Sequence, residues 1–107
     1  VIALNYMTTL DSLSAFSDLK LAVGQDISFI AFDDDLWMSA RLTGLTAIRQ
    51  PVKEIASAAW ARLFERIESS DPEMATQSIV LAAELVERKS VMDINNRVVA
   101  IKESKQA

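Results

Sequence analysis

Three amide or carboxylate side chains stand where three short apolar segments of the sequence end. Asn5 follows the apolar run 1–4, Asp33 follows the run 27–32, and Gln50 closes a third segment seventeen positions later. Short apolar runs of this kind are typical of buried parallel strands. Ligands of open α/β sheets bind beyond the C-terminal ends of such strands. The pattern therefore predicts a site at which Asn, Asp and Gln hold a polyhydroxylated small molecule through hydrogen bonds.

Each of these residues also has a structural interpretation. Asn5 and Asp33 both precede expected helices, and on residue physics alone capping or turn formation is the preferred reading of either. Capping explains Gln50 poorly, because this residue lies directly before Pro51. The acidic run 33–35 lacks the alternating spacing and the glycine of a calcium loop, so we expect no metal there and a solvated loop with one inward-facing member. Nothing positions a nucleophile or a partner base beside these carboxylates, so we predict no catalytic residues and no enzyme.

Composition limits the range of functions. The chain has 107 residues, half of them hydrophobic, with two glycines and two prolines, which predicts one globular domain or less. The absence of cysteine excludes disulfides. With histidine absent as well, a catalytic zinc site is not expected, and we expect no cofactor. A formal net charge of −4 argues against nucleic-acid binding by this segment. The sequence contains no run of 18 apolar residues, so we expect neither a membrane span nor a membrane partner.

Helical and extended patterns alternate along the chain. A stripe spaced by three residues predicts a helix over about 7–20, formed by Met7, Leu10, Leu13, Phe16 and Leu19. Pro51 opens the longest expected helix, which ends near Ser69. Its apolar face consists of Val52, Ile55, Ala59, Leu63 and Ile67, with Trp60 and Phe64 beside it. The last extended stretch is expected over 79–86, and the pattern fades after Ser90.

The order of these motifs resembles a known family. The segments 23–28 (VGQDIS), 31–34 (AFDD), 45–50 (LTAIRQ) and 85–90 (LVERKS) occur in the order and spacing of the C-terminal part of the effector-binding core of the lactose-repressor/galactose-repressor (LacI/GalR) family of bacterial transcription regulators. That core is in turn similar to periplasmic sugar-binding proteins. None of these motifs is decisive alone, and the resemblance rests on their ordered succession from about residue 1 to about residue 90.

The resemblance implies a fold and a division of the chain. The fold is α/β, a three-layer α/β/α arrangement with a mainly parallel sheet, here a partial periplasmic-binding-protein-like fold comprising mostly the C-terminal subdomain. Residues 1–50 would form the first part of that effector-binding subdomain, and 51–79 would cross to the N-terminal subdomain. Residues 80–93 would return, and 94–107 would form a C-terminal tail. Because the first residue already lies in a strand pattern, we interpret the chain as a fragment of a longer protein.

Departures from the family pattern add one candidate ligand contact. Tyr6 stands where the family has an aspartate, directly after Asn5, and is therefore a further candidate for ligand binding. Lys20 replaces a glycine at an expected left-handed helix cap. Ala31 replaces the glycine before the aromatic-Asp-Asp motif. These changes leave the predicted fold intact.

By the same resemblance, the outer face of the first helix and the loop after the acidic run lie at a dimer interface. The candidates are Leu10, Leu13, Trp37 and Met38. The competing interpretation is that Trp37 and Met38 are core residues under the loop. Tryptophan and methionine are enriched in interfaces, and we favour the interface slightly.

The resemblance implies a cytoplasmic regulator. Asn5, Asp33 and Gln50 would form one wall of a cleft for a small-molecule effector, expected to be a carbohydrate. The protein would be a homodimer that binds operator DNA only through an N-terminal domain outside this sequence. An alternative is a sugar-binding protein of a transport system, which a signal peptide upstream would identify. A third reading, a purely structural oligomerisation module, would show a cleft lined only by apolar groups.

Overall fold

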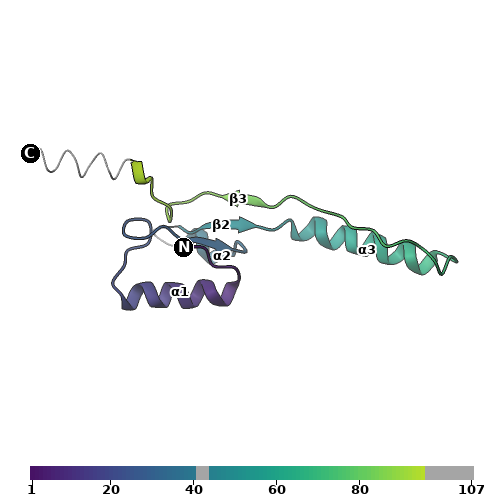
Figure 1. Cartoon of the computed structure of the whole chain (residues 1–107), viewed down its shortest axis with the longest axis horizontal. Helices are drawn as coiled ribbons and strands as arrows, with labels where there is room; N and C mark the ends of the chain where they lie inside the picture. Colours follow the sequence, from purple (N-terminus) through teal and green to yellow (C-terminus); the bar gives the residue numbers. More distant parts are fainter. Residues whose placement is uncertain (41–43, 96–107) are drawn as a thin grey trace, which may run out of the picture.

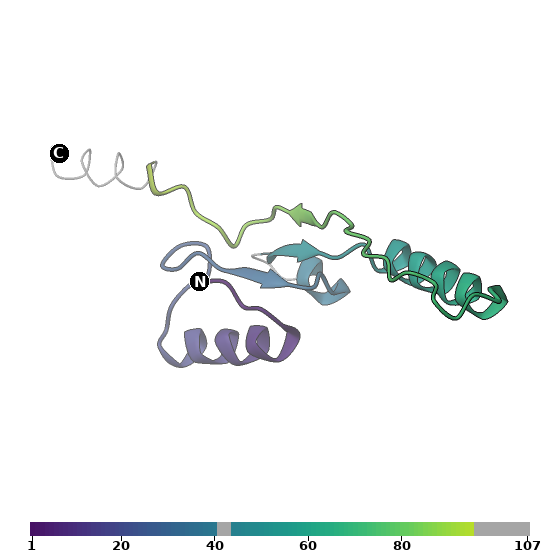
Figure 2. The same ribbon diagram turned by 45° about the vertical axis from the view of Figure 1, so that its right-hand side comes forward.

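The structure is a computed structural model, and it describes residues 1–40 and 44–95. In chain order the described elements are α1 (Tyr6–Asp18), β1 (Ile30–Phe32), α2 (Leu36–Ala40), β2 (Thr46–Arg49), α3 (Val52–Glu68) and β3 (Glu84–Val86). Figure 1 shows α1 lying along one side of the small sheet, while α3 projects away from the sheet at its far end. The turned view of Figure 2 shows the same separation.

The sheet is mixed. β1 and β2 are parallel neighbours, with Ala31 opposite Ala47, and β3 pairs antiparallel with the other edge of β2. The first residues of the chain lie parallel to β1 through a bridge between Ile2 and Ile30. The predicted α/β class is therefore confirmed, with a parallel part made by the first three segments. β3 is the antiparallel exception, and its ladder is shorter than the extended stretch expected over 79–86.

α1 is defined by local signals at both ends. The Asn5 side-chain oxygen accepts a hydrogen bond from the backbone N–H of Thr8 at 2.9 Å, and the Thr8 hydroxyl accepts one from the N–H of Asn5 at 3.2 Å. This reciprocal pair is a capping box. After the helix, Lys20 adopts φ = +56°, the left-handed conformation expected at this cap. The predicted span of about 7–20 is thus correct to within two residues at either end.

The core lies between α1, the sheet and α2. Phe16 of α1 packs edge-to-face on Phe29, with ring centroids 5.2 Å apart. The described core residues are Ala3, Phe16, Phe29, Ala31, Met38, Leu45 and Ala47. α2, which the sequence pattern predicted as a loop, carries Met38 into this core.

α3 has little contact with the sheet. Its predicted span, Pro51 to about Ser69, agrees with the observed helix, which has Pro51 as its N-terminal cap residue. None of the described residues of α3 is buried, and Trp60 is 63% exposed. The chain after α3 runs back along the helix toward β3 (Figure 1). Of the predicted tail, 96–107 lies outside the described residues.

Candidate functional site

The three predicted ligand residues lie at one edge of the sheet. Because residues 1–3, β1 and β2 run parallel side by side, their C-terminal ends point the same way. Asn5, Asp33 and Gln50 each follow one of these ends. β3 is antiparallel and places its first residue, Glu84, opposite Arg49 at the same edge.

Asp33 and Gln50 are in direct contact. The Gln50 side-chain nitrogen Nε2 donates a hydrogen bond to Asp33 Oδ1 at 2.5 Å, and both residues are half-buried. The backbone N–H of Asp33 donates to the carbonyl of Ile48 at 2.9 Å. Asp33 adopts φ = +71°, a left-handed conformation that aspartate tolerates better than most residues. The carboxylate is thus held by a carboxamide at the end of the neighbouring strand.

Asn5 has the structural role that residue physics favours, because its side-chain oxygen caps α1. The oxygen also accepts from the Thr8 hydroxyl at 3.1 Å. A cap of this kind uses the carbonyl oxygen, so the remaining hydrogen-bonding capacity of Asn5 is its amide NH2 group, a donor of two bonds. Capping and ligand contact are therefore compatible in one side chain.

The three carboxylates of the acidic run 33–35 have different partners. Asp33 contacts Gln50, whereas Asp35 accepts a hydrogen bond from the N–H of Leu36 at the start of α2. Asp34 is the inward-facing member, with its side chain 6% exposed. Within residues 1–40 and 44–95, no cluster of three or more acidic side chains has the geometry to hold a metal ion.

Asp34 is clamped by two arginines. Arg88 holds it with two bonds, from Nη1 to Oδ1 at 2.7 Å and from Nη2 to Oδ2 at 3.1 Å, while Arg49 donates to Oδ2 at 2.7 and 3.1 Å. The hydrogen bonds from Arg88 are the main reason that the pKa of Asp34 is lowered; desolvation opposes them, and Arg49 adds to the lowering. Arg49 also reaches Glu84 at 3.3 Å. This network was not predicted from the sequence, although the terminal motif LVERKS contains Arg88.

Ser90 of the same terminal motif ties two strands together. Its buried hydroxyl donates to the Phe29 carbonyl at 2.5 Å and accepts from the N–H of Thr46 at 2.8 Å. The backbone N–H of Phe29 in turn donates to the Ser90 carbonyl. The motif therefore joins the β1 and β2 regions at the end opposite the predicted ligand residues.

The aromatic residues near this edge have mixed exposure. Tyr6 is 40% exposed and stands edge-to-face to Trp37, with ring centroids 6.3 Å apart. Trp37 and Leu13 are partly buried against the core, whereas Leu10 is 38% exposed. Met38 is fully buried within the single chain, so the expectation that Met38 lies at a dimer interface is wrong. Its side chain has no surface left for a partner, and the core interpretation holds for it.

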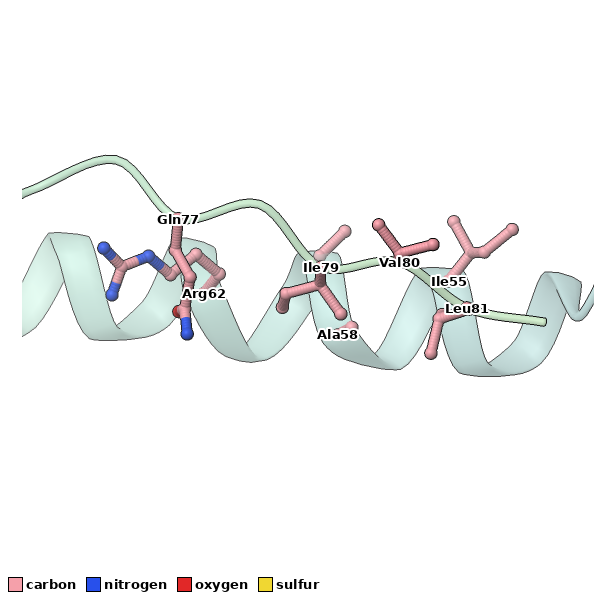
Figure 3. Close-up of a pocket in the computed structure, with 8 residues that line it drawn as sticks. Ile55, Ala58, Arg62, Gln77, Ile79, Val80 and Leu81 are labelled. Carbon is pink, nitrogen blue, oxygen red and sulfur yellow. The ribbon is translucent and has the colours of Figure 1, made fainter.

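A groove away from this edge runs along α3. It has a volume of about 540 Å³ and is lined by Ile55, Ala58, Ala59, Arg62, Gln77, Ile79, Val80 and Leu81. Figure 3 shows its apolar side chains projecting from the helix and from the returning segment. A smaller groove of about 370 Å³ includes Gln50, with Arg49 and Glu84. The larger groove contains none of the predicted ligand residues, which lie at the sheet edge, and its mostly apolar lining is typical of a packing surface.

Comparison with known proteins places this geometry in a family. Residues 1–91 match the family described as periplasmic binding protein-like domain, and the chain belongs to that family. It is 35% identical over 91 residues to the HTH-type transcriptional regulator KdgR of Bacillus subtilis (strain 168), a match that covers 85% of this chain and 26% of KdgR. The chain therefore spans about a quarter of the length of this relative.

Solved structures of transcription regulators are also similar to this chain. One is the LacI family transcriptional regulator CcpA from Weissella paramesenteroides with bound sucrose, with 30% identity, a TM-score of 0.67, and coverage of 88% of this chain and 32% of that chain. Another is the lac repressor dimer bound to operator and the anti-inducer ONPF, with 25% identity, a TM-score of 0.71, and coverage of 86% and 27%. The resemblance inferred from the motifs is confirmed: the chain belongs to the periplasmic binding protein-like domain family, and the proteins that it is similar to include LacI-family transcriptional regulators.

In the described residues, no helix is both long and apolar enough to cross a membrane.

Proposed function

We propose that this chain forms one wall of a cleft that binds a sugar or sugar-like effector. The observation that carries the proposal is the meeting of Asp33 and Gln50 at the ends of adjacent parallel strands, with Asn5 ending the next segment of the same edge. Ligands of α/β sheets bind at such edges.

The three side chains offer complementary hydrogen-bonding groups. The Asp33 carboxylate keeps its second oxygen as an acceptor for ligand hydroxyls, and bonds to a charged acceptor are the stronger kind. Gln50 fixes that carboxylate and has a carbonyl oxygen as a further acceptor. Asn5 would donate through its amide group, and the exposed ring of Tyr6 would contact the apolar face of a sugar ring. The proposal includes no catalytic step, cofactor or metal.

The relatives support a regulatory use of this binding. Among the similar structures one regulator holds sucrose, and one is a repressor dimer bound to operator. In the intact protein, an effector that binds open and closed arrangements unequally would shift their populations and so change affinity for operator DNA. We place the protein in the cytoplasm as a DNA-binding regulator whose operator contacts come from a domain outside this chain. The transport alternative is not favoured, since the relatives reported above are transcription regulators.

We further propose that the chain beyond Gln50 belongs mainly to the second subdomain. α3 has no buried residue among its described positions and shares an apolar groove with the segment 77–81. These surfaces would be covered by the N-terminal subdomain, with residues 51–79 crossing to it and 80–93 returning. The cleft would then lie between the two subdomains, at the edge that carries Asp33.

Dimerisation is the third part of the proposal. Leu10 on α1 is exposed, and Leu13 and Trp37 are partly exposed, so these residues can contribute to a contact between two copies. Symmetric homodimers are the commonest soluble assembly.

The test of effector binding uses the full-length protein that contains this chain. A thermal-shift screen of monosaccharides and disaccharides, with sucrose included, selects a ligand, and calorimetric titration measures its affinity. Asp33→Ala should weaken binding by about 1.5–3 kcal/mol, the usual scale for a hydrogen bond to a charged group. Asp35→Ala is the matched control, because its carboxylate accepts from the N–H of Leu36 and not from Gln50, and it should leave affinity unchanged. Unchanged affinity in Asp33→Ala would refute the role given to Asp33.

A further inference from the structure

Arg88 donates three side-chain hydrogen bonds beside the candidate site. Its guanidinium holds both carboxylate oxygens of Asp34 and also donates to the Leu45 carbonyl at 2.7 Å. Its own backbone N–H donates to the Thr46 hydroxyl at 2.9 Å. The side chain is 17% exposed. One residue from the terminal motif therefore links the turn after β1 to the start of β2.

The carboxylate that Arg88 holds follows directly after the candidate ligand residue. Asp33 sits at φ = +71°, and its N–H is tied to Ile48. Since the next residue, Asp34, is fixed by the guanidinium, the backbone of Asp33 is held from both sides. A left-handed non-glycine residue persists only where its surroundings determine it. The backbone that carries the Asp33 side chain toward Gln50 is thus constrained by its own bond to Ile48 and by the contacts of Asp34.

We propose that Arg88 is a positioning residue for the effector site: by clamping Asp34 it keeps the Asp33 carboxylate against Gln50, in the place where a ligand hydroxyl would meet it. The name effector site rests on the function proposed above, whereas the positioning itself does not. An arginine suits this task because its planar fork fits a carboxylate with two parallel bonds and still has a donor for a carbonyl. Lysine, a single point charge, cannot reproduce that geometry.

Arg49 is a weaker candidate for the same role. Its side chain is 49% exposed and divides its bonds between Asp34 and Glu84, so solvent screens the pair.

The aliphatic stem of Arg88 packs against the backbone of Gly44. A Cβ added to Gly44, which has φ = +57°, would lie 3.2 Å from the Arg88 Cβ. The stem of the arginine therefore packs closely on backbone, which restricts the positions its head can take.

The experiment distinguishes a positioning role of Arg88 from a role that only neutralises the charge of Asp34. In the full-length protein, Arg88→Met removes the clamp but leaves Asp34 buried without its main partner, so it lowers stability as well. The double variant Arg88→Met/Asp34→Asn removes that poorly paired charge and should recover stability. Arg62→Met is the matched control, because Arg62 pairs with Glu65 on α3, away from the sheet edge. The readouts are the Gln50 side-chain amide resonances in ¹⁵N-glutamine-labelled protein, unfolding by urea, and calorimetric titration with the screened sugar.

The proposal expects the Asp33–Gln50 hydrogen bond to be lost in both Arg88 variants, seen as a shift of the Gln50 amide resonances and their faster hydrogen exchange. Sugar affinity should fall about tenfold or more in both, the scale of one misplaced bond to a charged group. Arg62→Met should match wild type in both readouts. If the double variant regains the wild-type Gln50 signals together with stability, Arg88 only balances charge and the proposal is overturned. If the Gln50 signals change but wild type binds no sugar in the screen, positioning stands and the sugar assignment fails.

Discussion

At the scale of single residues, neighbouring carboxylates differ in role because of their partners and not because of their type. Asp33 and Asp34 are adjacent, yet one faces a carboxamide at the sheet edge and the other is enclosed by two guanidinium groups. The sequence predicted that one member of the acidic run faces inward. It could not say which one, because the Arg88 that decides this lies 54 positions away. A partner so distant leaves no local signal in the chain.

The two arginines around Asp34 link stability in acid to the ionisation of this carboxyl group. Its pKa is lowered from the ordinary value of 3.8, chiefly by the hydrogen bonds from Arg88. A group with a lowered folded-state pKa contributes stability that is present above its unfolded pKa and is lost as the pH falls through the folded one. We therefore expect the free energy of unfolding of Asp34→Asn to fall less between about pH 5 and pH 2 than that of wild type.

Urea unfolding at several pH values measures this difference. Asp35→Asn provides the comparison at a neighbouring exposed carboxylate. Parallel pH profiles for Asp34→Asn and wild type would contradict the clamp.

At the scale of elements, local rules predicted the helices well and the strands less well. α1 and α3 were located to within about two residues, because capping groups, an apolar stripe and a proline mark helix ends locally. The length and antiparallel direction of β3 depend on pairing with β2, nearly forty positions earlier. α2 was missed because Trp37 and Met38 were read as parts of a loop. Asp33 and Gln50 were expected at one edge and are in contact there, since parallel strands bring their ends to one edge.

The left-handed residue after α1 provides a test of that local logic. Lys20 holds φ = +56°, a conformation that costs an L-residue roughly 1–2 kcal/mol and costs glycine little. Lys20→Gly should therefore raise the free energy of unfolding, by up to about 1 kcal/mol once the greater freedom of glycine in the unfolded chain is counted. Lys53→Gly, in the exposed first turn of α3, should instead lower it by a similar amount. Chemical denaturation of both variants gives the two signs, and destabilisation by Lys20→Gly would contradict the cap.

The outer face of α1 tests the proposed dimer contact. Leu10 is exposed, whereas Met38 is buried, so a charge at Leu10 disturbs a contact between copies without opening the core. We expect Leu10→Asp to shift the full-length protein from dimer to monomer in sedimentation velocity, since a carboxylate in an apolar interface loses its water. Asp11→Leu is a control for general effects on the helix. A dimer that persists in Leu10→Asp over dilution would place the interface elsewhere.

At the scale of the whole molecule, the first half of the described chain forms a small core and the second half contributes surfaces that lack a cover. The residues that bury themselves come almost entirely from before Gln50, whereas the aromatic pair Trp60 and Phe64 is 63% and 44% exposed. This exposure follows from an apolar stripe on a helix that the sheet does not reach. Apolar surface left in water forgoes about 25 cal/mol for each Å². An exposed apolar face of this kind is typical of a surface that another part of the protein covers.

The substitution Trp60→Ala is therefore expected to have a small effect on stability in the isolated chain and a large one in the full-length protein. In the isolated chain, Trp60 packs only on Phe64 at the surface among the aromatic contacts described, so Trp60→Ala should change the free energy of unfolding by less than about 0.5 kcal/mol. In the full-length protein, where the N-terminal subdomain would bury the same side chain, the loss should be about 3–5 kcal/mol. The isolated chain should also associate as its concentration rises, and Trp60→Glu with Leu63→Glu should suppress that association.

Urea unfolding and sedimentation of both proteins measure these effects. Equal losses of stability in the two contexts would mean that α3 is covered within the chain itself, or is left bare in both, and either result would exclude the proposed crossing at Gln50. Because Arg49 and Gln50 are the last residues before that crossing, the same measurement decides whether the edge carrying Asp33 is one wall of a cleft or the rim of an independent domain.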